Sequence, residues 1–304
     1  MTISAKHNNQ IPLRSVRPIY SSSVPSSSLI TNPSTSHTSS SSSNTTNTPL
    51  INIETGKRKD GRTCDKFRNV FLQVGVIKQA RGSAYLEFHQ GTKIICAVYG
   101  PRQVSAKNVE FSDTGRLQCE YRVAQFASLH HNSRSSASSA MSATKSHQAT
   151  SEEIEFGIHM REALESSLRL DKYPKSVIDV YCFVLEDDGS ALSGAISCAS
   201  LALANAGIEM VDMVSACTTS ELEGQIVVDP TSHEYKYASG GMVCGFMSNL
   251  NEVTQLTQVG DMSFQKVSEA MDLCIDGCTK LYQLMQQCLI ESMMNTRTTI
   301  TTRE

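Results

Sequence analysis

The stretch GSAYLEFHQGTKIICAVYGPR, residues Gly82–Arg102, decides the fold of this chain. Apolar and polar residues alternate along GSAYLEFHQ and again along TKIICAVYGP, which is typical of strands with one buried face. Turn-forming residues punctuate the text at Gln90-Gly91 and, after the preceding run VFLQVGVIKQA, at Gly82-Ser83. The pattern therefore predicts two adjacent hairpins in an antiparallel sheet.

Outward from this stretch, strand-like and helix-like periods alternate. Apolar residues recur every three to four positions from Ile154 to Leu168 and from Phe264 to Leu289, which indicates two helices that each bury one side. Ser263 is the expected N-cap of the second of these helices. Strands are predicted at 117–127, 177–185, 213–230 (two strands, broken near 221–224), 241–248 and 253–259, and helices at 154–173, 193–206 and 263–295.

This order of elements implies an α+β fold in a single domain, with a mixed or antiparallel sheet packed against helices. We assign the domain to residues 56–295, between a disordered Ser/Thr/Asn-rich tail at 1–55 and a polar tail at 296–304. Residues 129–150 form a low-complexity loop inside the domain, and loops of that length are usually functional or disordered.

Composition narrows the classes of function. The chain has 304 residues, 39% of them hydrophobic and 19% charged, and its net charge is −3. A nearly neutral chain is not basic over its whole surface, so any contact with nucleic acid has to be local. No run approaches the length of an apolar membrane span, so we expect no membrane partner.

The ten cysteines are scattered, with no C-x-x-C pair and no histidine spacing that suits zinc. We interpret Cys274 and Cys278, which would share a helix face, as packing residues. Unpaired cysteines without an apolar signal-peptide segment favour a reducing compartment. Lys6, Arg14 and Arg17 in an acid-free N-terminus leave a mitochondrial transit peptide open, beside the favoured disordered tail.

Three acids, Glu186, Asp187 and Asp188, end an apolar run just before the small-residue helix. Acids at this place stabilise a helix N-terminus through its dipole, and a Ser or Asp there can cap it. The alternative is a metal site in which Glu186 and Asp188 converge on one face of the strand. We favour the structural role, because a metal-dependent nuclease would need more oxygen ligands than this stretch provides.

Four stretches together resemble the ribonuclease PH family: KRKDGR (Lys57–Arg62), Gly82–Arg102, ALESSLRL (Ala163–Leu170) and SLALANAGIEMVDMV (Ser200–Val214). The resemblance runs from residue 57 to about residue 292. It is closest to ring subunits of the eukaryotic RNA exosome, and CEYR and QQCL resemble the mRNA-transport-regulator type among them. It implies a ribonuclease PH-like fold and a six-membered ring with related subunits and cap subunits as partners. RNA would pass through the channel, in nucleus, nucleolus and cytoplasm.

Active members of the family are phosphorolytic 3′-to-5′ exoribonucleases, and the resemblance carries their phosphate-binding residues onto this chain. The family's Asp-Gly-Gly-Thr-Arg run places its Asp on Asp188 and its Gly-Thr-Arg on Ser190, Ala191 and Leu192. A second arginine position falls at about Glu152. Both arginines are therefore replaced, and the extra acids nearby lead us to expect that the site repels phosphate.

The family's two metal-holding aspartates follow a strand-end aspartate that matches Asp229. Their positions fall on Tyr235 and Gly241, neither of which offers a carboxylate, and a one-residue shift reaches only Glu234. We therefore predict no metal, no other cofactor and no catalytic residue. The resulting expectation is a structural exosome ring subunit that is not an enzyme and that supports rRNA processing and RNA decay. The alternatives are an active phosphate-dependent exoribonuclease and a free-standing RNA-binding module.

Weak RNA contacts are the remaining expectation. Family members place arginines that point into the channel on the strand that LQCEYR resembles, and those positions fall on Gln118 and Glu120. Nearby cations can still give salt-sensitive contacts to phosphates, or can be ordinary solvated side chains. The candidates are Arg102, Arg116, Arg122, Arg134 and Lys145, the last two in the acid-free loop 129–150.

Overall fold

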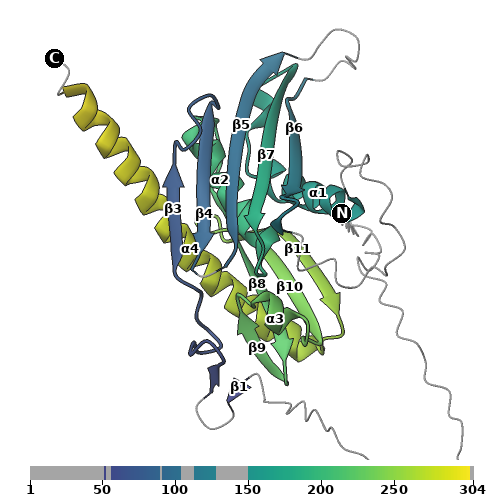
Figure 1. The fold of residues 1–304 in the computed structure, drawn as a ribbon. Coiled ribbons are helices and arrows are strands. Elements are labelled where there is room, and N and C mark those ends of the chain that lie inside the picture. The colour runs from purple at the N-terminus through teal and green to yellow at the C-terminus, as the bar shows by residue number, and fades with distance from the viewer. Residues whose placement is uncertain (1–50, 53–55, 90, 104–112, 128–149, 302–304) are drawn as a thin grey trace, which may run out of the picture. The chain divides into compact units, whose positions relative to one another are not determined.

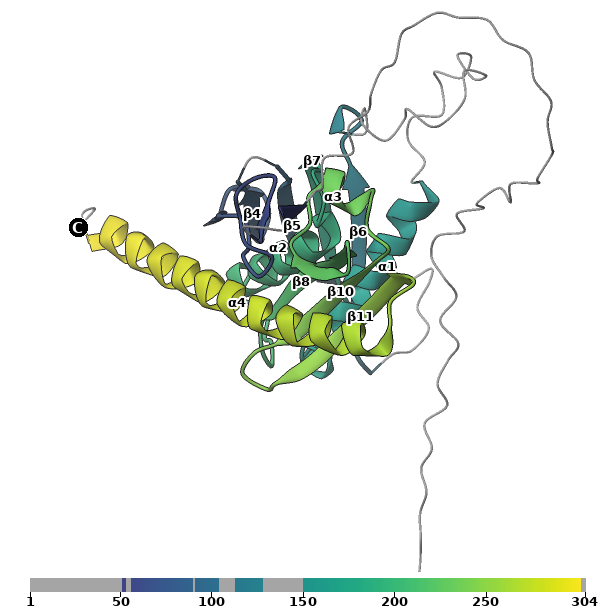
Figure 2. The same ribbon diagram turned by 90° about the horizontal axis from the view of Figure 1, so that it is seen from below.

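The computed structural model describes residues 51–52, 56–89, 91–103, 113–127 and 150–301. They form two main sheets with helices between and behind them, so the predicted α+β class is confirmed (Figure 1). Seen from below, the first sheet, helix α2, the second sheet and helix α4 follow one another as layers (Figure 2). The sequence predicted the elements but not their division between two sheets.

The first sheet contains the two predicted hairpins, which are confirmed. Its strand order is β3-β4-β5-β7-β6, and all pairs are antiparallel except β6 with β7. Gly82-Ser83 is the start of a strand rather than a turn, because α2 crosses here and a Cβ at Gly82 would lie 2.4 Å from the carbonyl oxygen of Ala202. The strands are β3 Val70–Val74, β4 Gly82–Phe88, β5 Lys93–Gln103, β6 Arg116–Val123 and β7 Ser176–Glu186.

The second sheet is antiparallel, with strand order β11-β10-β8-β9. The predicted break near 221–224 is confirmed as a tight turn in which Glu223 and Gly224 both have positive φ. Both faces of its central strands are buried, one against α2 and the other against α4. The strands are β8 Val214–Leu222, β9 Gln225–Val228, β10 Gly240–Met247 and β11 Glu252–Gly260.

Helix α2 (Ala191–Asn205) lies between the sheets and is buried on every side along most of its length. Small side chains allow this close packing: a Cβ at Gly194 would meet Ile94 Cδ1 at 2.8 Å. Buried Ile196, Leu201 and Leu203 each contribute about 1.5–3 kcal/mol by leaving water. The sequence therefore places a continuous core around this helix.

Helix α1 (Ser151–Glu165) ends earlier than the predicted residue 173. The Ser167 hydroxyl donates to the Leu164 carbonyl at 2.7 Å, and Leu168 forms an isolated bridge with Met210. These contacts take Ser167 and Leu168 out of the helix, so α1 ends before them. A short 3₁₀ turn at Leu170–Lys172 follows.

Helix α4 (Phe264–Thr301) covers the far face of the second sheet. Ser263 caps it as predicted, accepting a 3.4 Å hydrogen bond from the Lys266 N–H. Its Tyr282 hydroxyl donates to Asp212 at 3.1 Å and so fastens the helix to the segment before β8. The helix continues to Thr301 instead of ending near residue 295.

At the N-terminal side, β1 (Ile51–Asn52) pairs with β2 (Lys57–Arg58), so the chain is already structured within the tail that we predicted. Most of the tail 1–55 and the loop 129–150 lie outside the described residues, as do residues 302–304 of the polar tail. Within the described part, no helix combines the length and the apolar composition needed to cross a membrane.

Candidate functional site

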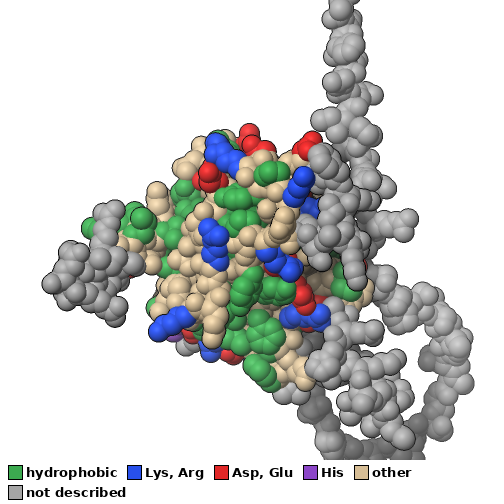
Figure 3. Space-filling view, turned by 90° about the horizontal axis from the view of Figure 1, so that it is seen from above, with side chains coloured by type: hydrophobic (Ala, Val, Ile, Leu, Met, Phe, Trp, Pro, Cys, Tyr) green, Lys and Arg blue, Asp and Glu red, His purple; other side chains and the backbone are tan. Residues whose placement is uncertain are grey.

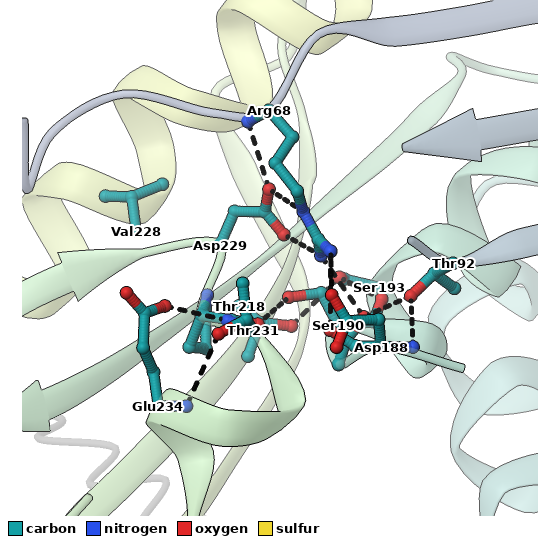
Figure 4. Close-up of polar contacts among 12 residues, drawn as sticks. Arg68, Thr92, Asp188, Ser190, Ser193, Thr218, Val228, Asp229, Thr231 and Glu234 are labelled. Carbon is teal, nitrogen blue, oxygen red and sulfur yellow. Dashed lines mark hydrogen bonds and ion pairs between the residues drawn. The ribbon is translucent and has the colours of Figure 1, made fainter. Parts of the chain in front are cut away.

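The loop Asp187–Ser190 joins the end of β7 to the start of α2, where the family resemblance places the phosphate cradle. Thr92, which is fully buried in the turn between β4 and β5, holds this loop (Figure 4). Its hydroxyl donates to the Gly189 carbonyl at 2.6 Å and accepts from the Asp188 N–H at 3.0 Å. The hairpin that decides the fold thus also fixes the helix entrance.

The loop takes a conformation that requires glycine at position 189. Gly189 has φ of +92°, and a Cβ there would lie 2.5 Å from the carbonyl oxygen of Pro230. The Ser232 N–H donates to the Asp188 carbonyl at 2.9 Å from the same side. The loop before α2 is therefore pressed against the segment that follows β9.

Arg68 and Asp229 form a buried bidentate ion pair beside this loop. The guanidinium donates from Nε at 2.8 Å and from Nη2 at 2.7 Å to the two carboxylate oxygens, and the Arg68 N–H adds a bond at 3.1 Å. Burial alone would raise the pKa of Asp229, but its hydrogen bonds and ion pair with Arg68 hold that pKa below its ordinary value. Both groups therefore stay charged.

The same guanidinium extends to the helix entrance. Its Nη1 lies 3.3 Å from both the carboxylate and the carbonyl of Asp188, and its Nη2 donates to the Gly189 carbonyl at 3.3 Å. The group also stacks over Phe88, 5.1 Å from the ring centroid. Arg68 thus connects the segment before β3, the end of β9 and the start of α2.

Two further arginines surround Asp229. Arg62 Nη1 lies 3.4 Å from its carboxylate, and Arg58 Nη1 donates to its carbonyl at 3.2 Å. Arg58 also faces Glu234 at 3.6 Å, and Glu234 in turn accepts the Thr231 N–H at 2.8 Å in a capping box. Burial lowers the pKa of Arg58, and the nearby Arg62 acts in the same direction. Carboxylate and guanidinium groups alternate here, and their charges offset one another.

A chain of hydroxyl groups runs along the first turn of α2. Thr218 donates to Ser193 at 2.9 Å, and Ser193 donates to the Ser190 carbonyl at 2.9 Å. Ser190 occupies the N-cap position in the left-handed region, but its hydroxyl donates to Pro230 at 3.3 Å and makes no cap bond. The predicted side-chain cap is therefore absent. The first N–H groups of α2 point toward the loop and form the positive end of the helix dipole there.

Three acids, one at the end of β7 and two in this loop, have separate partners. Glu186 pairs with Lys93 at 2.8 Å, and Asp187 accepts the Gly189 N–H at 2.9 Å. Burial raises the pKa of Asp188, although Arg68 opposes this effect, and 38% of its side chain remains exposed. Asp188 thus meets both the helix entrance and solvent. In the described part of the chain, no three or more His, Cys, Asp or Glu side chains are grouped to hold a metal.

The other positions to which the family resemblance assigns phosphate binding do not lie together in a charged site. Ala191 and Leu192 are both buried, and Leu192 packs in the main core. Glu152 is exposed in the first turn of α1, where the neighbouring Glu153, rather than Glu152, closes a capping box with Thr150. No interaction among the described residues connects Glu152 to the loop before α2.

The two metal positions carried over from the family lie together. Tyr235 ends the short helix α3 (Ser232–Tyr235), and its ring atom Cε2 lies 3.0 Å from where a Cβ of Gly241 would be. The ring therefore occupies the space that a carboxylate at Gly241 would need. Burial raises the pKa of Tyr235, so its hydroxyl is neutral. The residues present do not fit a divalent metal at this place.

Two predicted RNA-binding arginines flank one strand. Arg102 of β5 and Arg116 of β6 both lie opposite Val177 of β7. Arg102 forms an ion pair with the buried Asp179, and Arg116 is exposed. These two positive charges are brought together by the sheet rather than by the sequence.

Arg122, the third, pairs with Glu120 at 2.8 Å and lies 4.0 Å from Glu153. Arg134 and Lys145 lie outside the described residues.

Sequence reasoning missed Arg68 and Thr92, which position the loop. Arg58 and Arg62 were present in the KRKDGR motif, and Asp229 was noted as a strand-end acid. Nothing in the sequence indicated that these residues contact one another. The available sequence signal for Arg68 was a single arginine before a strand. That feature is too common to mark a site residue unless the fold is known.

Two family models match the chain in succession. Residues 66–209 match domain 1 of the 3′ exoribonuclease family and residues 212–277 match its domain 2. The boundary between the two matches falls just before β8, where the chain passes from the first sheet to the second. The division into two sheets follows these two parts.

Relatives of similar length cover most of the chain. It is 37% identical over 235 residues to an "Exosome complex component RRP41-like" of Arabidopsis thaliana, covering 77% of this chain and 85% of the relative. It is 36% identical over 236 residues to an "Exosome complex component Rrp41" of Cenarchaeum symbiosum, covering 78% and 91%.

Solved structures share the fold. Rice Rrp46 superposes with a TM-score of 0.63 at 22% identity, covering 75% of this chain and 98% of that one. A chain of the Archaeoglobus fulgidus exosome, solved with RNA bound to the active site, gives a TM-score of 0.62 at 19% identity, covering 76% and 93%.

These matches overturn the expectation that the chain is not an enzyme, because both matched models describe 3′ exoribonucleases. The expectation rested on replaced positions alone, Leu192 and Glu152 among them. It left out the contacts that hold the loop before α2, where Arg68 lies 3.3 Å from the Asp188 carboxylate.

Proposed function

Because this chain belongs to the 3′ exoribonuclease family of the ribonuclease PH type, we propose that it acts in phosphate-dependent 3′-to-5′ degradation of RNA as a subunit of an exosome ring. The observation that carries the proposal is the extent of the likeness to Rrp41-type exosome components, 85% to 91% of whose length is covered at 36% to 37% identity. The proposed partners are other ribonuclease PH-like subunits, cap subunits and RNA.

The loop before α2 supports this proposal by its geometry. The first N–H groups of a 15-residue helix face the loop and favour an anion at this end. Thr92 and Arg68 fix the loop before any ligand arrives, so little reorganisation is needed when charge develops. Asp188 presents a partly exposed carboxylate at the same place.

The proposed reaction is displacement at the terminal phosphodiester. An oxygen of inorganic phosphate attacks phosphorus, the bond to the preceding 3′ oxygen breaks, and a nucleoside diphosphate leaves. In this chain, Arg68 would hold the loop and Asp188 would orient the reacting groups. Since Asp229 and Asp188 already balance the charge of Arg68, the chain alone should bind phosphate weakly. We therefore assign the reaction to the assembled ring.

Within the ring, we propose an Rrp41-like position, since the relatives at 33% to 37% identity carry that name. The narrower mRNA-transport-regulator type stays a prediction from the sequence motifs. Distribution among nucleus, nucleolus and cytoplasm and a role in rRNA processing are also proposals. Imaging of the tagged chain and analysis of rRNA precursors after its depletion test them.

The experiment is phosphorolysis by a reconstituted ring. Rings that contain the chain should release nucleoside diphosphates from the 3′ end of oligo(A) in a magnesium buffer with phosphate, and should release none without phosphate. Release of nucleoside monophosphates regardless of phosphate would replace the proposal with hydrolysis. No release at all, from rings that assemble, would overturn it.

A further inference from the structure

Helix α3 and the turn that continues it carry an exposed pair of rings to which the proposed reaction assigns no role. The rings of His233 and Tyr237 lie 5.3 Å apart between centroids, at an interplanar angle of 50°. Tyr237 is 65% exposed, and His233 is exposed as well. The Tyr237 N–H donates to the Glu234 carbonyl at 3.0 Å, which keeps the helical turn and sets the two rings side by side. We call His233 and Tyr237 the aromatic pair.

The aromatic pair is anchored directly beside the loop before α2. The Ser232 N–H, next to His233 in the chain, donates to the Asp188 carbonyl at 2.9 Å. Thr231 caps α3 and accepts the Glu234 N–H at 3.3 Å (Figure 4). The Glu234 side chain is buried and faces a guanidinium of the KRKDGR motif at 3.6 Å. These contacts hold α3, and with it the aromatic pair, in a fixed position relative to the candidate site.

Three lysines add positive charge around α3. Lys236 stands next to Tyr237 in the chain, and Lys57 and Lys59 flank the arginine of the KRKDGR motif that faces α3. All three are exposed, and none forms an ion pair with another residue in the described part of the chain. The exposed acid of the motif, Asp60, is already paired at 2.6 Å. On the face seen from above in Figure 3, by contrast, cations and anions are both present among hydrophobic side chains.

This combination of rings and unpaired lysines decides between nucleic acid and protein as the ligand. Proteins bind single-stranded nucleic acid by stacking bases on aromatic rings while cations bind the phosphates. The centres of protein interfaces also contain aromatic residues, but they are depleted in lysine. The composition around α3 is therefore that of a surface for single-stranded RNA.

The place of the aromatic pair indicates which base of the RNA it receives. The terminal phosphodiester is proposed to react at the loop before α2, and α3 begins against that loop through Ser232 and Asp188. The base nearest the reacting phosphate belongs to the last nucleotide of the strand. A terminal base that is held there would bring its phosphate to the loop, which is the positioning that displacement requires.

We propose that the aromatic pair stacks the 3′-terminal base of single-stranded RNA, with Lys57, Lys59 and Lys236 near its phosphates. The inference rests on the proposed function, which brings an RNA end to the loop before α2. His233 and Tyr237 are positioning residues: they hold the base, whereas bonds form and break at the phosphodiester. Because every base has a π-face, this subsite accepts any of the four bases.

The first test is photo-cross-linking of RNA to assembled rings in the absence of phosphate. The RNA is oligo(A) that ends in 4-thiouridine, and mass spectrometry locates the cross-link in this chain. We expect it at His233 or Tyr237, and we expect no cross-link there when the same label stands near the 5′ end. Cross-links of the 3′-terminal label only at other residues, in this chain or in another subunit, would overturn the inference.

The second test compares KM and kcat in rings whose other subunits have been inactivated. Tyr237→Ala should raise KM for oligo(A) about fivefold or more and leave kcat unchanged, because it removes stacking that does not change during the reaction. On oligo(A) with an abasic 3′-terminal nucleotide, wild type and Tyr237→Ala should have the same KM. Tyr237→Phe keeps the ring and should keep the wild-type KM. Leu250→Ala, 45% exposed in the turn at the other end of β10, is the control and should change neither value. An equal rise in KM on abasic RNA would show a merely structural role.

The two tests separate this inference from the proposed function, because cross-linking needs no turnover. Rings that cross-link at the aromatic pair but release no nucleoside diphosphate would overturn the proposed function alone. Rings that release nucleoside diphosphate without a cross-link at the pair would overturn the inference alone. Failure of Tyr237→Ala to assemble into rings would also overturn the inference, in favour of a protein interface at α3.

Discussion

Arg68 and Asp229, which lie 161 residues apart in the chain, form a buried bidentate ion pair at 2.7 and 2.8 Å. The same arginine donates to the Gly189 carbonyl, so the pair holds the entrance of α2 in a fixed position relative to the end of β9. A bidentate fork fixes direction as well as distance. This pair is therefore the main support of the candidate site.

Removal of the arginine should destabilise the fold strongly. In Arg68→Ala, Asp229 remains buried without its main partner, and breaking a buried pair in this way costs about 3–5 kcal/mol. Urea denaturation followed by circular dichroism measures the loss in the free energy of unfolding. Lys280→Ala is the control, because its partner Asp276 is exposed, and it should cost less than about 1 kcal/mol. Equal losses in the two variants would contradict the role of the pair.

The pair also predicts how stability changes with pH. The pKa of Asp229 is lower in the folded than in the unfolded chain, so its contribution is present above the unfolded pKa of about 3.9. That contribution is lost as pH falls through the folded pKa. Wild type should therefore exceed Asp229→Asn in stability by a constant amount above about pH 5, and the difference should shrink below about pH 4. A difference that grows on acidification would contradict this assignment.

Two glycines of similar φ separate crowding from backbone strain. Gly189→Ala combines an unfavourable φ of +92° with a Cβ 2.5 Å from the Pro230 carbonyl, whereas Gly207, at φ +71°, has no atom within 4 Å of such a Cβ. Gly207→Ala should cost about 1 kcal/mol, and Gly189→Ala about 2–3 kcal/mol more, since backbone must move. Melting temperatures compare the two. Equal shifts would show that the loop before α2 is not tightly held.

The sequence predicts the local parts of this fold well. Alternation along Gly82–Phe88 and Lys93–Gln103 is a property of each strand by itself, and so is the small-residue content of α2. The parallel pairing of β6 with β7 depends on a connection that periodicity does not describe. The early end of α1 depends likewise on the tertiary bridge between Leu168 and Met210. Local patterns cannot contain such partners.

The place of the candidate site could be predicted from the sequence, but its ion pairs could not. The family resemblance places an aspartate at Asp188, and it predicts replaced positions at Leu192, Tyr235 and Gly241. The ion pair between Arg68 and Asp188 could not be read in the same way, because the two residues lie 120 positions apart. The conclusion that the chain is not an enzyme rested on the replaced positions alone, and it was wrong.

The central claim is tested most directly by phosphate-dependent release of nucleoside diphosphates from rings in which every other subunit has been inactivated. With the wild-type chain we expect release, and with Asp188→Ala we expect a loss of at least tenfold. Asp276→Ala, which removes an exposed acid on α4, should leave the rate unchanged. Equal release by rings with Asp188→Ala, or by wild-type rings without added phosphate, would contradict the claim.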